Sequence, residues 1–155
     1  MVDAKLGKTL KTPATLKWVK HVLTNLAFWK NAHWVTPSLA VGDITLPSHA
    51  DRLGLTKVYD VRHLFDEDFT PRWPDAHIFA VKVADELRLG ERVGLYCYGG
   101  IDRSPFIAAL VLHWLESTSL GEAYTVVLRR RPQAFRHPEW ERGFREWLAG
   151  LGRKA

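Results

Sequence analysis

The chain has 155 residues, of which 46% are hydrophobic and 25% are charged, and its formal net charge is +5. This length suits one domain with one sizeable core, and the composition is that of an ordinary soluble globular protein. No apolar run is long enough to span a bilayer, and residues 1–30 lack the uncharged apolar core of a signal peptide. We therefore expect a cytoplasmic protein with no membrane span.

Basic side chains gather toward the two ends of the chain. Residues 1–30 hold six lysines and one acid, and residues 129–155 hold eight basic residues and three acids. Such ends attract phosphorylated partners, RNA or anionic lipid in some proteins, and in others they are solvated helix faces. Nucleic acid therefore stays open as a partner, and the pattern does not define an oligomeric state.

The chain divides into a basic N-terminal extension with a helix, residues 1–30, and a main domain, residues 31–155. In the main domain, residues 33–42 predict a strand, a turn and a second strand. They are followed by a short helix, a strand and an acidic, proline-containing loop at 47–54, 56–62 and 63–74. Helical periodicity and one short apolar run then predict a helix, a strand and three more helices at 75–89, 92–96, 104–115, 119–130 and 138–150.

This order of elements predicts a single α/β domain with a central, mainly parallel sheet flanked by helices. In such sheets, functional sites lie at the carboxyl ends of the strands. Cys97, the one cysteine in the sequence, directly follows the strand at 92–96. A lone cysteine forms no internal disulfide and no zinc cluster by itself, so it is either inert packing or a reactive thiol.

The residues that follow Cys97 favour the reactive alternative. The segment reads Cys97-Tyr-Gly-Gly-Ile-Asp-Arg103-Ser104-Pro105 and leads into an apolar helix. Its two glycines allow a tight turn with inward N–H groups, and the helix N-terminus adds a positive dipole. Arg103 can hold two oxygens of a phosphate, and the positive field favours the thiolate over the thiol. A thiolate at the base of an anion-binding loop is suited to attack on phosphorus.

The pattern Cys97-x5-Arg103-Ser104 resembles the signature of the cysteine-dependent protein tyrosine phosphatases, especially the compact dual-specificity members. The similarity extends over about residues 33–150. It implies that Cys97 becomes a phosphocysteine, that Ser104 assists departure of the thiolate, and that no metal or cofactor is needed. It also implies that the phosphoryl group is held by the loop residues Tyr98, Gly99, Gly100, Ile101, Asp102 and Arg103.

The same resemblance implies a general acid that protonates the leaving oxygen, usually an aspartate from an upstream loop. Asp68-Phe-Thr-Pro71 resembles the acid loop of the family, so Asp68 is our first candidate and Asp66 the second. Asp102 is the alternative, because myotubularins and some bacterial lipid-active relatives also carry Asp directly before the arginine. The non-catalytic alternatives are solvated acids in the loop, and a helix cap or salt bridge for Asp102.

One departure from the family concerns Tyr96, which stands where a histidine usually orders the loop. The implied activity is hydrolysis of phosphate monoesters, with phosphotyrosine and also phosphoserine or phosphothreonine of a protein as substrates. Four alternatives remain: a phosphatase for RNA 5′-phosphate or a phosphoinositide, a non-catalytic phosphate-binding module, a rhodanese-like sulfur transferase, and a basic nucleic-acid binder that uses residues 1–30 and 129–155.

Overall fold

A computed structural model describes residues 31–154, so the helix expected within residues 1–30 lies outside the described part. The elements are, in chain order, β1 (Ala32–Thr36), β2 (Leu39–Gly42), α3 (Leu46–Leu53), β3 (Lys57–Asp60), the 3-10 helix η1 (Arg62–Leu64), α4 (Trp73–Arg88), β4 (Val93–Tyr96), α5 (Arg103–Glu116), α6 (Leu120–Arg130) and α7 (Pro138–Lys154). None of the helices in this range has the length and apolar content needed to cross a membrane.

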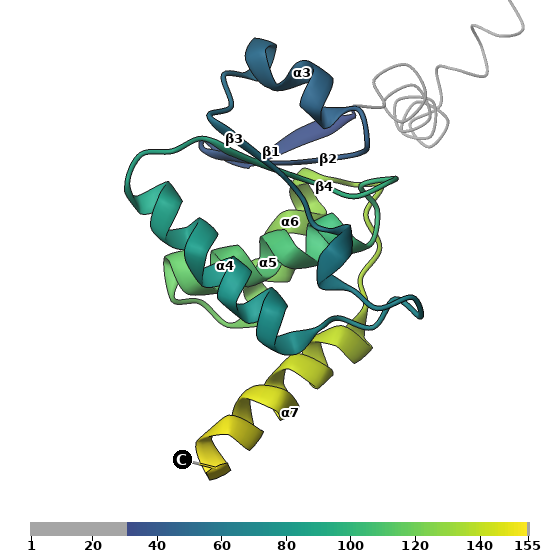
Figure 1. Cartoon of the computed structure of the whole chain (residues 1–155), viewed down its shortest axis with the longest axis vertical. Coiled ribbons are helices and arrows are strands. Elements are labelled where there is room, and N and C mark those ends of the chain that lie inside the picture. The colour runs from purple at the N-terminus through teal and green to yellow at the C-terminus, as the bar shows by residue number, and fades with distance from the viewer. Residues whose placement is uncertain (1–30, 155) are drawn as a thin grey trace, which may run out of the picture. The chain divides into compact units, whose positions relative to one another are not determined.

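The four strands form one sheet in the order β1-β2-β4-β3. The strand β4 pairs in parallel with both β2 and β3, and only β1 runs antiparallel to its neighbour. Figure 1 shows α3 over one face of this sheet and α4, α5 and α6 over the other. The predicted α/β domain with a mainly parallel sheet and flanking helices is therefore confirmed. The strand β4, which lies between β2 and β3, ends directly before Cys97.

The helix α5 forms the centre of the core. Every residue from Ser104 to Leu112 is buried, as expected for a helix that is apolar on all sides. The strand β4 is also buried at Val93, Gly94 and Leu95. The loop between them, residues 97–102, is consequently anchored at both ends by elements that cannot shift without disturbing the core.

The structure differs from the sequence prediction where the strand expected at 56–62 ends. The strand β3 stops at Asp60, whose carboxylate accepts the backbone N–H of Arg62 at 3.0 Å and also binds its guanidinium. This local bond turns the chain into η1, because a short aspartate side chain competes with the sheet for backbone donors. The following helix, α4, begins at Trp73 and carries Pro74 in its first turn, a position that suits proline.

Candidate active site

The sulfur of Cys97 lies at the junction of β4 and α5. Cys97 is only 2% exposed. Its Sγ lies 3.4 Å from the backbone nitrogen of Ser104, which donates to it, and 3.3 Å from Ser104 Oγ. The helix thus presents an N–H group and a hydroxyl to the sulfur from its first turn, where the helix dipole is positive. The structure therefore brings two of the predicted residues, Cys97 and Ser104, into direct contact.

The hydroxyl of Ser104 has a second partner, the carbonyl oxygen of Gly42, at 3.2 Å. A hydroxyl carries one proton and can donate to only one acceptor at a time. When Cys97 is a thiolate, the sulfur can only accept, so Ser104 must donate to it and release Gly42. The position of one proton is thus linked to the charge on the sulfur.

The loop after Cys97 has its carbonyl groups tied from outside. The carbonyl oxygens of Tyr98 and Ile101 accept the backbone N–H groups of Ile44 and Phe135, both at 3.0 Å. Those of Gly99 and Gly100 accept the guanidinium of Arg131 at 3.5 and 2.5 Å. Four consecutive carbonyls are therefore fixed on the outer side of the loop.

Fixing these carbonyls also determines where the N–H groups of the loop point. None of the peptide bonds described between residues 31 and 154 is cis, and in a planar trans peptide the N–H of one residue points opposite to the preceding C=O. The N–H groups of Gly99, Gly100, Ile101 and Asp102 therefore face the inside of the loop. Within residues 31–154 none of these four groups donates a hydrogen bond to the protein. Inward N–H groups without protein partners form an anion-binding cradle.

Gly100 is the residue on which the loop geometry depends. Its φ is +64°, and a Cβ placed there would lie 2.5 Å from Nη2 of Arg131 and 2.6 Å from the carbonyl oxygen of Gly42. Any side chain would meet both the left-handed backbone conformation and this close packing. Gly99 is different, because a Cβ there would meet only the side chain of Ile101, at 3.5 Å.

The predicted phosphate clamp, Arg103, contacts the acid-bearing loop. Its guanidinium lies over the ring of Phe69, 4.7 Å from the ring centroid. Phe69 is 51% exposed and has a φ of +64°, which is uncommon for a bulky residue. A cation–π contact of this kind accounts for an exposed aromatic ring in a strained turn. The fold thus places the turn 66–71 against the loop that holds Cys97.

The two acids of that turn differ in their contacts. Asp66 forms an ion pair with Arg72 at 2.9 Å, and its backbone groups close the turn with Phe69 and Thr70. Asp68 is exposed, and its carboxylate makes one contact among the described residues, accepting the N–H of Thr70 at 3.1 Å. The carboxylate of Asp66 is therefore committed to an arginine, whereas that of Asp68 keeps most of its acceptor capacity.

The third acid, Asp102, is held by a histidine that the sequence did not single out. Its Oδ1 lies 2.8 Å from Nε2 of His137, and the other ring nitrogen of His137 lies 2.9 Å from Oε1 of Glu139. The imidazole also stacks on Trp140 with 3.8 Å between ring centroids. Asp102 makes no side-chain cap to α5. Among the described residues, Asp102 thus makes neither the helix cap nor the salt bridge to a nearby arginine that the sequence suggested, and its carboxylate contacts a histidine instead.

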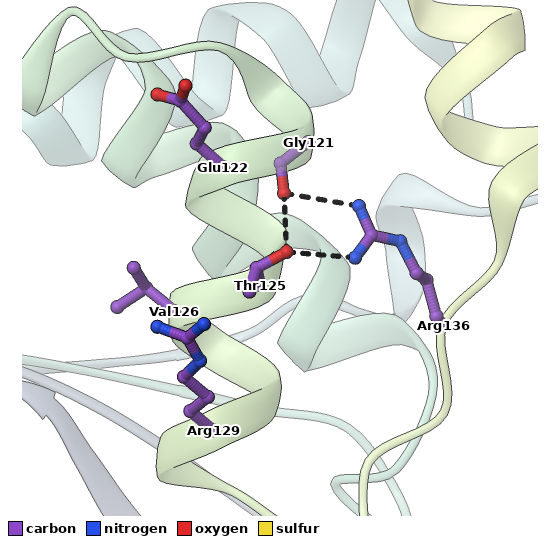
Figure 2. Close-up of a pocket in the computed structure, with 6 residues that line it drawn as sticks. All are labelled: Gly121, Glu122, Thr125, Val126, Arg129 and Arg136. Carbon is purple, nitrogen blue, oxygen red and sulfur yellow. Dashed lines mark hydrogen bonds between the residues drawn. The ribbon is translucent and has the colours of Figure 1, made fainter.

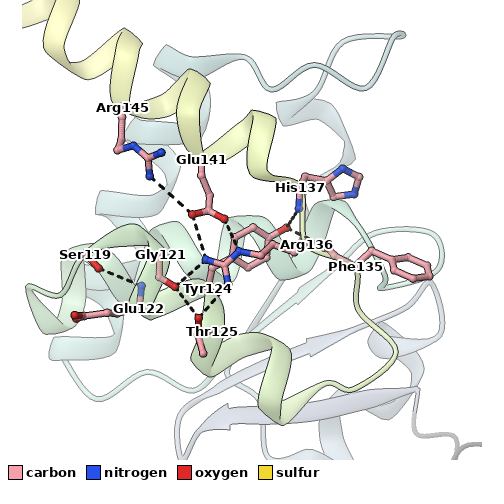
Figure 3. Close-up of polar contacts among 10 residues, drawn as sticks. All are labelled: Ser119, Gly121, Glu122, Tyr124, Thr125, Phe135, Arg136, His137, Glu141 and Arg145. Atoms are coloured by element: carbon pink, nitrogen blue, oxygen red, sulfur yellow. Dashed lines mark hydrogen bonds and ion pairs between the residues drawn. The ribbon is translucent and has the colours of Figure 1, made fainter.

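Figure 3 shows how the segment from Phe135 to His137 is fixed by side chains of α6 and α7. The hydroxyl of Tyr124 donates to the carbonyl of Phe135 at 3.2 Å and accepts the N–H of His137 at 3.1 Å. Arg136 binds the carboxylate of Glu141 at 2.6 Å. Burial raises the pKa of Tyr124 strongly, so its hydroxyl stays protonated and can serve both neighbours. This network positions Phe135 and His137, which contact Ile101 and Asp102.

Tyr96, in the place of the usual histidine, is the last residue of β4. It is half-buried, and its carbonyl oxygen accepts the N–H of Val61 at 2.9 Å. Its hydroxyl makes no hydrogen bond to any residue from 31 to 154. The loop carbonyls are instead tied by the groups described above, so their orientation does not depend on this residue.

The surface hollows described among residues 31–154 lie away from the loop 97–103. One hollow of about 430 Å³ lies along α6. Figure 2 draws the residues that line it, Gly121, Glu122, Thr125, Val126, Arg129 and Arg136. None of these residues belongs to the loop 97–103, and the guanidinium of Arg136 is occupied by Glu141, Thr125 and Gly121. Among residues 31–154, no cluster of three histidine, cysteine or acidic side chains is arranged to hold a metal ion.

Arg131 is a second site residue that the sequence did not single out. For the run Arg129-Arg130-Arg131 the sequence predicts a mostly solvated basic face, with one pocket-lining arginine as the alternative. In the structure Arg131 is fully buried while the other two are exposed. The helical spacing of this segment does indicate that Arg131 is buried. Position 131 follows Val127 by four residues and Tyr124 by seven, so it falls on the buried face of α6.

Comparison with known proteins agrees with this arrangement. No family model and no curated protein matches the sequence. Among solved structures, human DUSP28 superposes with a TM-score of 0.66 at 18% identity, covering 79% of this chain and 96% of its own. PTPMT1 gives 0.61 at 17% identity, covering 80% and 99%, and Tk-PTP in its active form gives 0.60 at 20% identity, covering 77% and 97%. The chain has the fold of the dual-specificity-phosphatase-like cysteine phosphatases.

Proposed function

We propose that this protein is a metal-independent cysteine phosphatase that hydrolyses phosphate monoesters through a phosphocysteine at Cys97. The observation that carries the proposal is the loop in which four carbonyls are tied outward around a buried thiol. That arrangement leaves converging N–H groups for the phosphoryl oxygens, next to Arg103 and the start of α5. The fold shared with human DUSP28, PTPMT1 and Tk-PTP supports it.

In the first step, the Cys97 thiolate attacks phosphorus as the bond between phosphorus and the leaving oxygen breaks. The loop amides and Arg103 bind the three phosphoryl oxygens, where negative charge is concentrated. The leaving oxygen takes a proton from a general acid, for which we propose Asp68. Its exposed carboxylate lies in the turn that Phe69 holds against Arg103.

In the second step, water attacks the phosphocysteine, the sulfur–phosphorus bond breaks, and the water proton passes to Asp68. The sulfur leaves as a thiolate, which Ser104 Oγ stabilises by turning its proton from Gly42 to the sulfur. This step yields inorganic phosphate and the free enzyme, and the two steps together balance without any redox partner or metal.

The substrate we propose is a phosphotyrosine-containing protein, with phosphoserine and phosphothreonine as further substrates. The second candidate is a phosphoinositide, since PTPMT1 has been solved in complex with PI(5)P, and Asp102 lies directly before Arg103 in this chain. A panel of a phosphotyrosine peptide, an RNA 5′-phosphate and phosphoinositide vesicles separates these substrates by kcat/KM.

The proposal is tested by hydrolysis of p-nitrophenyl phosphate and phenyl phosphate with chelator present. We expect activity in the natural sequence and none above background in Cys97→Ser. Asp68→Ala should affect phenyl phosphate, whose leaving group is poor, far more than p-nitrophenyl phosphate. A larger effect of Asp102→Ala would move the acid role to Asp102. An inactive natural protein that still binds inorganic phosphate would indicate a non-catalytic phosphate-binding module instead.

A further inference from the structure

We infer that Arg131 is a positioning residue for the phosphate-binding loop, because its guanidinium fixes two peptide planes of that loop from the side opposite to the N–H groups. This inference rests on the proposed function for the identity of the anion. Arg131 lies 28 positions after Arg103 in the sequence and does not belong to the Cys-x5-Arg pattern.

The first part of the argument concerns hydrogen bonds. Nε of Arg131 donates to the carbonyl oxygen of Gly100, and Nη2 approaches that of Gly99. These two peptides are the ones whose N–H groups belong to Gly100 and Ile101, in the middle of the cradle. A guanidinium has a rigid fork of donors and accepts nothing. It can therefore hold two adjacent carbonyls in a fixed relation, which one water molecule or one ammonium group does not.

The second part concerns what holds Arg131 itself. Its Nη1 lies 2.9 Å from Nδ1 of His33, and since the guanidinium can only donate, this ring nitrogen accepts. Arg131 begins the segment after α6, and its backbone N–H is bonded to the carbonyl of Val127 at 2.9 Å. The side chain therefore reaches the loop from a helix end and meets β1 on the way, so three parts of the fold meet at this guanidinium.

The third part concerns charge. Burial lowers the pKa of Arg131 to about 10, and the negative charges of Asp43 and of Cys97 oppose that effect. Arg131 is accordingly a cation at neutral pH, buried at 0% exposure. A buried cation is costly unless partners compensate for its lost hydration. The carbonyl oxygens of Gly99 and Gly100 and the ring nitrogen of His33 are such partners for Arg131.

The experiment uses Cys97 as its own reporter. Because the chain has one cysteine, alkylation by iodoacetamide followed by intact mass reads this thiol alone. Inorganic tungstate, a phosphate analogue, protects the thiol when it occupies the cradle, and the half-protecting concentration gives its apparent affinity. We would compare the natural sequence with Arg131→Met, Arg131→Lys and the matched control Arg130→Met, which changes the exposed neighbour.

For Arg131→Met we expect at least a roughly tenfold rise in the half-protecting tungstate concentration, because hydrogen bonds to a charged group weaken when two cradle N–H groups lose their orientation. Arg131→Lys restores the charge and one donor and should recover part of the affinity, and Arg130→Met should stay within twofold. A role in packing alone predicts the opposite order, since methionine fills the buried space without a charge whereas lysine buries an ammonium group.

Tungstate affinity within twofold of the natural sequence in a folded Arg131→Met protein would overturn the inference. If that variant does not fold, Gly100→Ala takes its place, because the added Cβ would push the loop and the guanidinium of Arg131 apart. Unchanged tungstate affinity in Gly100→Ala would overturn the inference equally. Neither readout requires turnover. A protein whose tungstate site depends on Arg131 but which hydrolyses nothing would refute the proposed phosphatase function and leave this inference standing.

Discussion

Two segments build the candidate site, and they are held in opposite ways. The loop 97–103 joins a buried strand to a buried helix, and all four of its middle carbonyls are bonded to groups from other parts of the fold. The acid turn 66–71 is exposed over most of its length. The contact described between this turn and the loop is the ring of Phe69 on the guanidinium of Arg103.

This contrast matches the two tasks of the proposed reaction. Binding a phosphoryl group in its transition state requires donors that are already in place, because any reorganisation would raise the barrier. A general acid must instead meet leaving groups of different size and let the product depart, so a turn that can move is an advantage. We infer a rigid anion cradle and a mobile acid, joined by one aromatic side chain.

The largest expected effect comes from breaking the rigid half. Gly100→Ala places a Cβ against Arg131 and Gly42 at a φ of +64°, so the loop must shift and the cradle amides lose their alignment. We expect kcat/KM for p-nitrophenyl phosphate to fall roughly 10³-fold. Gly99→Ala is the matched control and should lose much less, because its Cβ meets only a flexible side chain. Equal losses in the two variants would contradict the special role of position 100.

A smaller effect is expected from removing the proposed general acid, Asp68, from the exposed turn 66–71. Asp68→Asn should lower kcat for phenyl phosphate roughly 10²-fold and change kcat for p-nitrophenyl phosphate little, because a good leaving group needs no acid. The neighbouring Glu67→Gln, also exposed, is the control. Steady-state kinetics on both substrates decides the outcome, and a similar loss on the two substrates would argue against an acid role for Asp68.

Smaller still is the effect expected from releasing the contact between the halves. A left-handed backbone costs phenylalanine about 1–2 kcal/mol, whereas an exposed cation–π pair returns about 0.5–1 kcal/mol. Phe69→Gly removes both the backbone strain and the cation–π contact, so we expect an equal or higher thermal unfolding midpoint. We also expect an approximately tenfold loss of kcat on phenyl phosphate. Phe69→Ala keeps the strain and should be less stable than Phe69→Gly. Full activity in the glycine variant would mean that the stack does not position the turn.

The smallest expected effect concerns the pH dependence of stability. His77 packs among Trp114, Phe144 and Trp147, and burial, with a smaller contribution from His113, lowers its pKa below 6.5. The unfolded chain then binds more protons below about pH 6.5, so stability falls as pH decreases through that value and toward the lower folded pKa. His77→Phe should flatten this fall in urea unfolding between pH 7.5 and 5.5. An unchanged slope would show that other groups cause it.

Much of the fold was predictable because its signals are local. The order of strands and helices, the glycine after α3 and the place of Cys97 at the end of β4 follow from periodicity and turn residues. The end of β3 was not predictable from these signals, because the Asp60 carboxylate binds the backbone N–H of Arg62, two positions later, in competition with the sheet.

The site was predictable only where its residues are adjacent in sequence. The contact of Cys97 with Ser104 lies within one loop and the first turn of its helix. The bonds from Arg131 to Gly100 and from His137 to Asp102 join residues more than thirty positions apart, and the stack of Phe69 on Arg103 has a similar span. Such pairs depend on how the elements pack, and one sequence without relatives gives no direct record of them.

The most direct test of the central claim is to look for the covalent intermediate. Turnover of p-nitrophenyl phosphate would be quenched with acid within milliseconds and the protein analysed by intact mass and peptide mapping. We predict a protein fraction heavier by one phosphoryl group, with the group on the peptide that contains Cys97 and absent from Cys97→Ser. Measurable hydrolysis with no phosphorylated protein, or with phosphate on another residue, would contradict the phosphocysteine mechanism.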